Sequence, residues 1–185
     1  MASLPIETWT GVRHRTGGGR PFAREMASRC LLAVLAVALC YCLQWEWLRR
    51  FTADANVWLD SLAGVQLQRL SFDTVAWHGQ FYRYVVACTF ADVWCGSLAF
   101  LWRIDETFSR NAAVIVVWSV LLFAFNIFRL SLSDVLFAQG LSWNLAHNVV
   151  SGISYFAVWQ VLWWRLRQGR ETIQSTVSRI PVENV

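Results

Sequence analysis

The sequence contains no lysine, so all 16 basic residues are arginine, and only 15% of its residues carry a charge. This low charged fraction, with 56% apolar residues and a mean hydropathy of +0.39, excludes an ordinary soluble globular domain. Internal repeats and long linkers are also absent, which predicts one domain. The sequence therefore indicates an integral membrane protein.

Four long apolar windows are present, at 30–48, 84–102, 111–130 and 145–164. Each is about 19–20 residues long, enough at about 1.5 Å per residue to cross a hydrocarbon core of ~30 Å. We therefore predict an all-α membrane protein with four transmembrane helices. Between the first two windows, apolar residues at helical spacing in 57–70 predict an amphipathic helix on the outer surface. Alternation around His78-Gly79 predicts a short hairpin.

The arginines predict the orientation in the membrane. They gather in 13–29, in the connection 103–110 and in 165–170, and such clusters mark cytoplasmic segments. Arg49 and Arg50, at the outer end of the first window, run against this pattern. Both termini are expected inside, with a basic tail at 1–29, a transmembrane domain at 30–170 and a C-terminal tail at 171–185. The first window is interpreted as an uncleaved signal anchor in a multi-pass protein of the plasma membrane.

Three reactive side chains from three windows reach one membrane depth. Counted from the cytoplasmic arginines at about 1.5 Å per residue, Cys88, Arg129 and His147 lie roughly 22, 28 and 27 Å up. That layer is near the outer water interface. The sequence therefore predicts a pocket that contains a thiol, a guanidinium and an imidazole.

The helix dipoles are expected to stabilise the charged forms of the Cys88 and Arg129 side chains in this pocket. Cys88 is expected in the first turns of the second helix, where the positive dipole end stabilises a thiolate. Arg129 is expected at the negative end of the third helix, which stabilises a cation. His147 is expected to open the fourth helix, with Ser142 or Asn144 as its cap.

These residues resemble the motifs of the exosortase/archaeosortase group of membrane-embedded cysteine transpeptidases. The resemblance rests on Ala87-Cys88-Thr89, Asn126-Ile127-Phe128-Arg129 and Leu145-Ala146-His147, in matching order and on the matching side of the membrane. It covers about residues 75–165. Members usually carry a glycine two residues after the cysteine, where this chain has Phe90, and most have about eight spans.

The resemblance implies a catalytic domain in which Cys88 attacks a substrate peptide bond and forms a thioester. Arg129 would stabilise the thiolate or the oxyanion, and His147 would protonate the leaving amine. The implied substrates are secreted proteins that end in a short motif, a transmembrane helix and an arginine cluster. No metal, organic cofactor or nucleic acid is implied.

Three further polar residues are predicted to support the pocket. Asp92 either orients His147 or Arg129, or is a neutral structural acid bonded to Ser119 or a similar group. Asn126 either positions Arg129 or bonds a neighbouring helix. Thr89, which follows the cysteine, is the third supporting residue.

Other polar side chains are expected to have no part in the chemistry. Asp134 is predicted to be a solvated loop acid. His78 is predicted to be a surface side chain, with a reserve role as the catalytic acid. Glu46 is predicted to form an ion pair with Arg49 and Arg50.

Two alternative functions are retained. The pair Cys40 and Cys42 is compatible with a membrane thiol–disulfide oxidoreductase. That function needs a second outer pair, whereas Cys95 is expected about half a membrane below the outer surface and Cys30 at the cytoplasmic end. Cys30, Cys40, Cys42 and Cys95 are therefore interpreted as packing residues. A non-catalytic small membrane subunit is the other alternative, and it predicts that the pocket residues are individually dispensable.

Overall fold

The computed structural model describes residues 19–104 and 106–177, with side chains from 23 to 104 and from 106 to 167. Residues 1–18 and 178–185 of the predicted tails lie outside the described residues. The described chain is mostly helical. In order, its elements are α1 (Gly19–Tyr41), α2 (Glu46–Leu62), β1 (Gln68–Arg69), β2 (Thr74–Trp77), β3 (Gln80–Arg83), the 3-10 turn η1 (Val86–Thr89), α3 (Ala91–Leu101), α4 (Phe108–Ala138) and α5 (Trp143–Val177).

The first apolar window, 30–48, is not one helix. α1 ends at Tyr41, and α2 begins at Glu46 with an 86° change of direction. Trp45 sits at the bend in the left-handed conformation (φ 49), and its indole N–H donates to the carbonyl of Cys40 at 2.9 Å. The amphipathic helix predicted at 57–70 is therefore α2, which begins inside the predicted first span and ends at Leu62.

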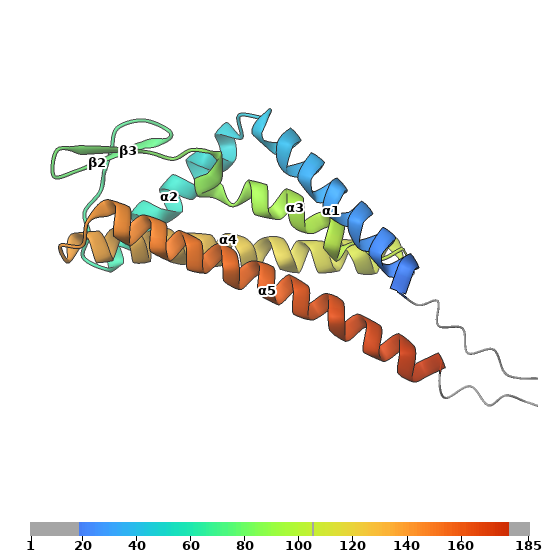
Figure 1. Cartoon of the computed structure of the whole chain (residues 1–185). Helices are drawn as coiled ribbons and strands as arrows, with labels where there is room; N and C mark the ends of the chain where they lie inside the picture. The colour runs from blue at the N-terminus through green and yellow to red at the C-terminus, as the bar shows by residue number, and fades with distance from the viewer. Residues whose placement is uncertain (1–18, 105, 178–185) are drawn as a thin grey trace, which may run out of the picture.

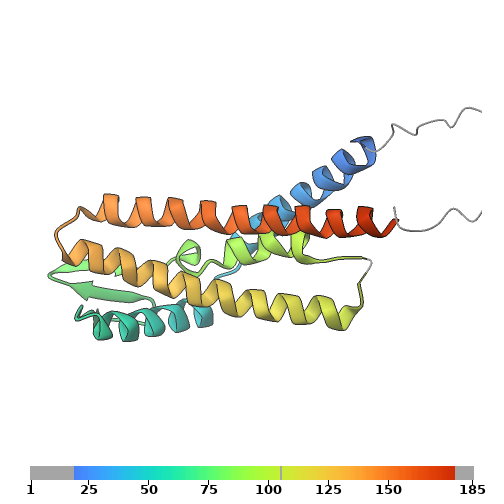
Figure 2. The same cartoon turned by 90° about the horizontal axis from the view of Figure 1, so that it is seen from below.

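The amphipathic pattern of α2 is reversed relative to that of a soluble protein. Thr52, Asn56 and Asp60 are fully buried, whereas Trp47 and Trp58 are exposed. A helix turns its polar face inward when the surroundings are less polar than the interior contact. α2 lies beside α4 (Figure 2). α4 buries polar side chains of its own, among them Asn126 and Ser131.

A small antiparallel sheet follows α2, so the all-α prediction is wrong at this point. The strand order is β1-β2-β3, and Trp77 pairs with Gln80 across a two-residue turn. His78 and Gly79 occupy that turn with φ values of 47 and 78, the two positive angles that a type I′ hairpin requires. The predicted hairpin is thereby confirmed.

Asp73 fixes the sheet to α2. Its carboxylate accepts hydrogen bonds from Arg49 and, at 2.9 Å, from Nε of Arg83. Asp73 therefore takes the place of Glu46, whose predicted ion pair with Arg49 is wrong. The ion pair with Asp73 also neutralises the charge of Arg49, one of the two arginines that do not fit the predicted cytoplasmic clustering of arginines.

The second window, 84–102, is not a membrane-long helix either. It contains an extended segment, the turn η1 and the 11-residue helix α3. At 1.5 Å per residue α3 is roughly 16 Å long, about half of a hydrocarbon core. Arg29 of α1 caps its C-terminal end, because Nη1 donates to the carbonyls of Ala99 at 2.9 Å and Trp102 at 3.1 Å.

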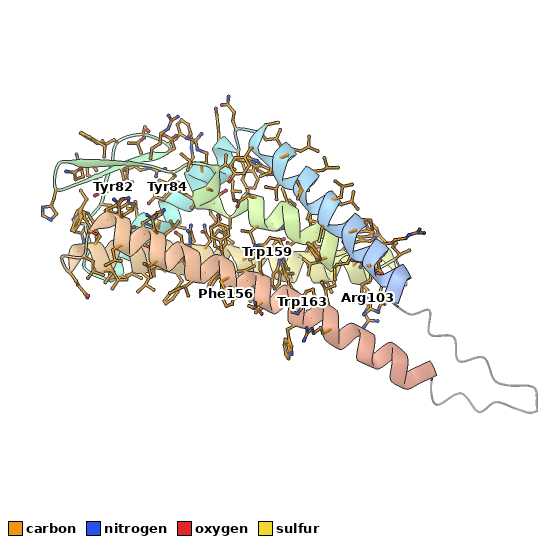
Figure 3. All side chains as sticks on the ribbon, in the orientation of Figure 1. Tyr82, Tyr84, Arg103, Phe156, Trp159 and Trp163 are labelled. Carbon is orange, nitrogen blue, oxygen red and sulfur yellow. The ribbon has the colours of Figure 1, made fainter. Side chains whose placement is uncertain are left out.

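The third and fourth windows lie inside α4 and α5, which extend beyond them. The hydroxyl of Ser142 accepts from the N–H of Leu145 at 3.4 Å and caps α5, one of the two predicted caps. α4 and α5 lie side by side, and α1 begins at the end of the molecule where α5 finishes, opposite the β2–β3 hairpin (Figure 1). Tyr82 and Tyr84 lie at the hairpin end and Arg103 at the other (Figure 3).

The four predicted spans are only partly supported. Within the described residues, α4 is the one helix long and apolar enough to cross a membrane, and α1 with α2 passes the same test only as one bent pair. Large apolar side chains nevertheless stay exposed on α1, α4 and α5. The core joins α3, α4 and α5 through Phe90, Val93, Leu101, Trp118, Leu122, Val158 and Leu162.

Candidate functional site

The three predicted reactive residues line one cavity of about 210 Å³. Cys88 comes from η1, Arg129 from α4 and His147 from α5. The remaining wall residues are Val85, Ala87, Asn148, Ser151 and Tyr155. Tertiary structure therefore brings the predicted thiol, guanidinium and imidazole together.

Cys88 lies in η1 and not in the first turns of a long helix. Thr89 holds this turn, since its hydroxyl donates to the carbonyl of Val86 at 2.7 Å and accepts from the N–H of Ala91 at 3.2 Å. α3 begins at Ala91, so the thiol precedes the helix whose dipole was expected to act on it. The predicted placement of Cys88 is wrong, while the supporting role of Thr89 has a structural basis.

Phe90 links the turn to α3 in the left-handed conformation (φ 56). That conformation favours glycine, and an L side chain adopts it at a cost of order 1 kcal/mol. Glycine is the residue that the exosortase/archaeosortase motif usually has here. The phenyl ring is buried, and its centroid lies 4.5 Å from Cζ of Arg129, so it forms one wall around the guanidinium.

Asn126 connects the cysteine turn to the arginine. Its Nδ2 donates to the backbone carbonyl of Cys88 at 2.8 Å, and its Oδ1 accepts from Nη2 of Arg129 at 2.9 Å. The side chain is fully buried. Asn126 therefore contacts both Arg129 and the turn η1, so its hydrogen bonds are compatible with both alternatives considered for it.

Arg129 is held by neutral groups. Besides Asn126, its hydrogen-bond partner is the hydroxyl of Ser151, to which Nη1 donates at 2.7 Å. Only 2% of the residue is exposed, yet it lines the cavity and interacts electrostatically with Cys88, His147 and Tyr155. Its hydrogen-bond partners in the described part of the chain are neutral, although the carboxylate of Asp92 also acts on its charge, so part of that positive charge is directed at whatever occupies the cavity.

His147 lies in the second turn of α5. Its ring stacks on Trp143 with centroids 4.9 Å apart and planes 15° apart. Among the described residues, its buried Nδ1 has no hydrogen-bond partner. The ring is therefore oriented by stacking and not by a carboxylate.

Asp92 is bonded to hydroxyl groups, as the structural alternative expected, but not to Ser119. Its Oδ2 accepts from the hydroxyls of Tyr41 at 2.9 Å and Tyr155 at 3.2 Å. Ser119, the partner proposed for the structural role, accepts instead from Nε1 of Trp94 at 2.7 Å. Asp92 thus reaches the cavity through Tyr155, which lines it.

Sequence reasoning missed the contribution of α5 beyond His147. Ser151 and Tyr155 follow the histidine at intervals of four residues and line the same cavity, as does Asn148. A polar stripe at i, i+4 and i+8 in an otherwise apolar window is a signal that a helical projection would have found.

Two other predictions concern residues outside the cavity. His78 is exposed in the hairpin turn, as expected for a surface side chain. Asp134 is not a loop acid, because it lies within α4 and accepts from Nδ2 of Asn56 at 2.7 Å. The prediction that Asp134 is solvated is wrong.

The remaining cysteines divide into two groups. Cys30 and Cys42 are exposed thiols. Cys40 is buried in α1 and interacts with the thiol of Cys95 in α3. All five cysteines of the chain are free thiols.

Comparison with known proteins adds no family assignment. No protein-family model, curated protein or solved structure matches this chain. Among the described residues, no group of three or more His, Cys, Asp or Glu side chains is arranged to hold a metal ion.

Proposed function

We propose that this chain is a membrane-embedded cysteine transpeptidase or protease that cleaves the C-terminal sorting signal of secreted proteins. The cavity shared by Cys88, Arg129 and His147 carries this proposal. A nucleophile, a fixed cation and an acid–base group suffice for acyl transfer through a thioester.

A membrane setting is part of the proposal. The reversed pattern of α2 and the exposed apolar side chains of α1, α4 and α5 suit a lipid environment. In this arrangement α1, α4 and α5 cross the plasma membrane, and α3 reaches from the cavity to the cytoplasmic connection near Arg103. The cavity then opens towards the outer face, and both termini lie inside.

The first half-reaction follows from the residues around the cavity. The Cys88 thiolate attacks the carbonyl carbon of the scissile peptide bond, and the carbonyl oxygen becomes an oxyanion beside the Arg129 guanidinium. When the C–N bond breaks, protonated His147 gives its proton to the leaving amine. The N-terminal part of the substrate remains bound to Cys88 as a thioester.

The second half-reaction releases this acyl group. Neutral His147 takes a proton from an incoming amine or water, which attacks the thioester carbonyl. The C–S bond breaks, and Cys88 returns as a thiolate beside Arg129. An amine acceptor completes transpeptidation, and water completes cleavage.

The proposed substrate is a membrane-anchored secreted protein. Its C-terminal helix would lie beside α3, which spans only part of the bilayer, and its arginine cluster would remain at the cytoplasmic face. The scissile bond, just outside the helix, would then reach the depth of Cys88.

Cleavage of a reporter tests the proposal. A secreted protein with a C-terminal helix and arginine cluster is co-expressed with wild type, with Cys88→Ala and with Cys42→Ala, a matched control at an exposed thiol. We expect processing, seen as increased gel mobility, with wild type and with the control only. Processing by Cys88→Ala would rule out the nucleophile.

The contact between Cys40 and Cys95 favours a second candidate, a thiol–disulfide oxidoreductase. This function requires both thiols and does not require Arg129. Oxidation of a reduced periplasmic reporter that is lost in Cys40→Ser and retained in Arg129→Met would favour it over the transpeptidase.

A further inference from the structure

A second polar cluster lies between α2 and α4, apart from the side chains that line the cavity. Nδ2 of Asn56 lies 2.8 Å from Oδ2 of Asp60, 2.7 Å from Oδ2 of Asp134 and 3.0 Å from the hydroxyl of Tyr84. Asp60 also interacts with Ser131. Asn56 and Asp60 are fully buried.

The cluster holds two carboxyl groups, and no cationic side chain is among their hydrogen-bond partners in the described part of the chain. Asp60 and Asp134 contact each other, and their other hydrogen-bond partners in the described part of the chain are the amide of Asn56 and the hydroxyl of Ser131. The neighbouring Arg49 is bound to Asp73 on the sheet. Two adjacent carboxylates cannot both stay ionised in a buried site unless a positive charge joins them.

Unpartnered oxygen atoms supply an independent observation. Oδ1 of Asn56 and Oδ1 of Asp60 are buried and have no hydrogen-bond partner, and neither has Oγ1 of Thr52, one turn earlier on the same face of α2. The Nδ2 group of Asn56 has two hydrogens for three neighbouring oxygen atoms, so at least one of the three receives no hydrogen from this amide. The cluster therefore has more oxygen acceptors than donors.

We propose that Asn56, Asp60 and Asp134, assisted by Tyr84 and Ser131, bind a calcium ion. Each available ligand atom is an oxygen, which is what a hard cation prefers, and two carboxylates balance a charge of +2. Rotation of the Asn56 amide group about its Cβ–Cγ bond exchanges the positions of Nδ2 and Oδ1, so that the oxygen faces the ion. Ca²⁺ accepts irregular shells of 6–8 oxygens, whereas Mg²⁺ keeps several waters that a buried cluster does not accommodate.

Calcium at this position would brace the outer end of the molecule. It would tie α2 to α4 and would hold Tyr84, the residue that begins the segment leading to Cys88. The proposal does not depend on the transpeptidase function, because it concerns binding and stability alone.

Thermal unfolding of the full chain in detergent tests the site. Protein treated with EDTA is titrated with CaCl2 or MgCl2, and tryptophan fluorescence reports the Tm. At 100 times the Kd, Ca²⁺ should raise the Tm by about 5–10 °C. Asp60→Asn and Asp134→Asn should lose this shift. Asp54→Asn, a matched control on the exposed face of α2, should keep it.

Equilibrium dialysis with radioactive calcium covers the case in which a variant fails to fold. Wild type and Asp54→Asn should each bind one Ca²⁺ per chain. Absence of binding to wild type at 10 mM Ca²⁺ would overturn the proposal and would mean that the two carboxyl groups share a proton instead. Unchanged binding to either cluster variant would also overturn it.

Discussion

Replacement of Asn126 by leucine should show that this amide holds the candidate site together. Leucine has a similar volume but offers neither a donor nor an acceptor. The change removes the 2.9 Å hydrogen bond from Arg129 and the 2.8 Å hydrogen bond to the carbonyl of Cys88. Because Asn126 is fully buried, no solvent replaces these contacts.

The magnitude follows from the two bonds. A hydrogen bond to a charged group contributes about 1.5–3 kcal/mol and a neutral one about 0.5–1.5 kcal/mol, so Asn126→Leu should reduce the free energy of unfolding by about 2–4 kcal/mol. For a chain of this size, each kcal/mol lowers the Tm by about 2–4 °C. The expected fall in Tm is therefore about 4–16 °C.

Thermal unfolding in detergent, followed by tryptophan fluorescence, measures the effect. Asn144→Leu is the matched control, because Asn144 is exposed in the first turn of α5 and its replacement should change the stability by no more than about 0.5 kcal/mol. A Tm of Asn126→Leu within about 2 °C of wild type would refute the view that Asn126 ties Arg129 to the cysteine turn.

Three further substitutions test local features by the same unfolding measurement. Thr89→Val should cost about 1–2 kcal/mol through two lost hydrogen bonds, and Thr89→Ser should restore most of the stability. Phe90→Gly should relieve about 1 kcal/mol of backbone strain but lose about 3–5 kcal/mol of burial, so a net gain in stability would contradict the packing argument. Gly96→Val should lower the Tm, because an added Cβ would lie 3.1 Å from Val37 and 3.4 Å from Trp159, whereas Gly152→Ala, in open space, should not.

Local patterns predicted the parts of the fold that depend on nearby residues. The turn at His78-Gly79 was predictable because alternating residues flank it and the turns that join two strands through two residues favour glycine, which adopts a positive φ without strain. The helical cores 111–130 and 145–164 were predictable because long apolar runs without breakers form helices. The bend at Trp45 was not, since it depends on an indole hydrogen bond to Cys40 and on the ion pair of Arg49 with the sheet.

The polar residues of the candidate site also divide into features that the sequence predicts and features that it does not. The residue types of Cys88, Arg129 and His147 were visible in the sequence, and the structure places all three on one cavity. Asp92 was recognised as a buried acid in need of a partner, but that partner is a pair of tyrosines from α1 and α5. A partner on another helix cannot be chosen from spacing within one helix.

By itself, the sequence determined an apolar chain whose basic residues are all arginine, with a thiol, a guanidinium and an imidazole in three apolar windows, because composition and spacing are local quantities. Only the tertiary structure decided that 84–102 is a turn and a short helix, that Asn126 joins Arg129 to Cys88, and that α2 turns its polar face inward. These features depend on which elements pack together. Packing depends on burial and hydrogen bonding between residues that are far apart in the chain, so a short stretch of sequence does not predict it.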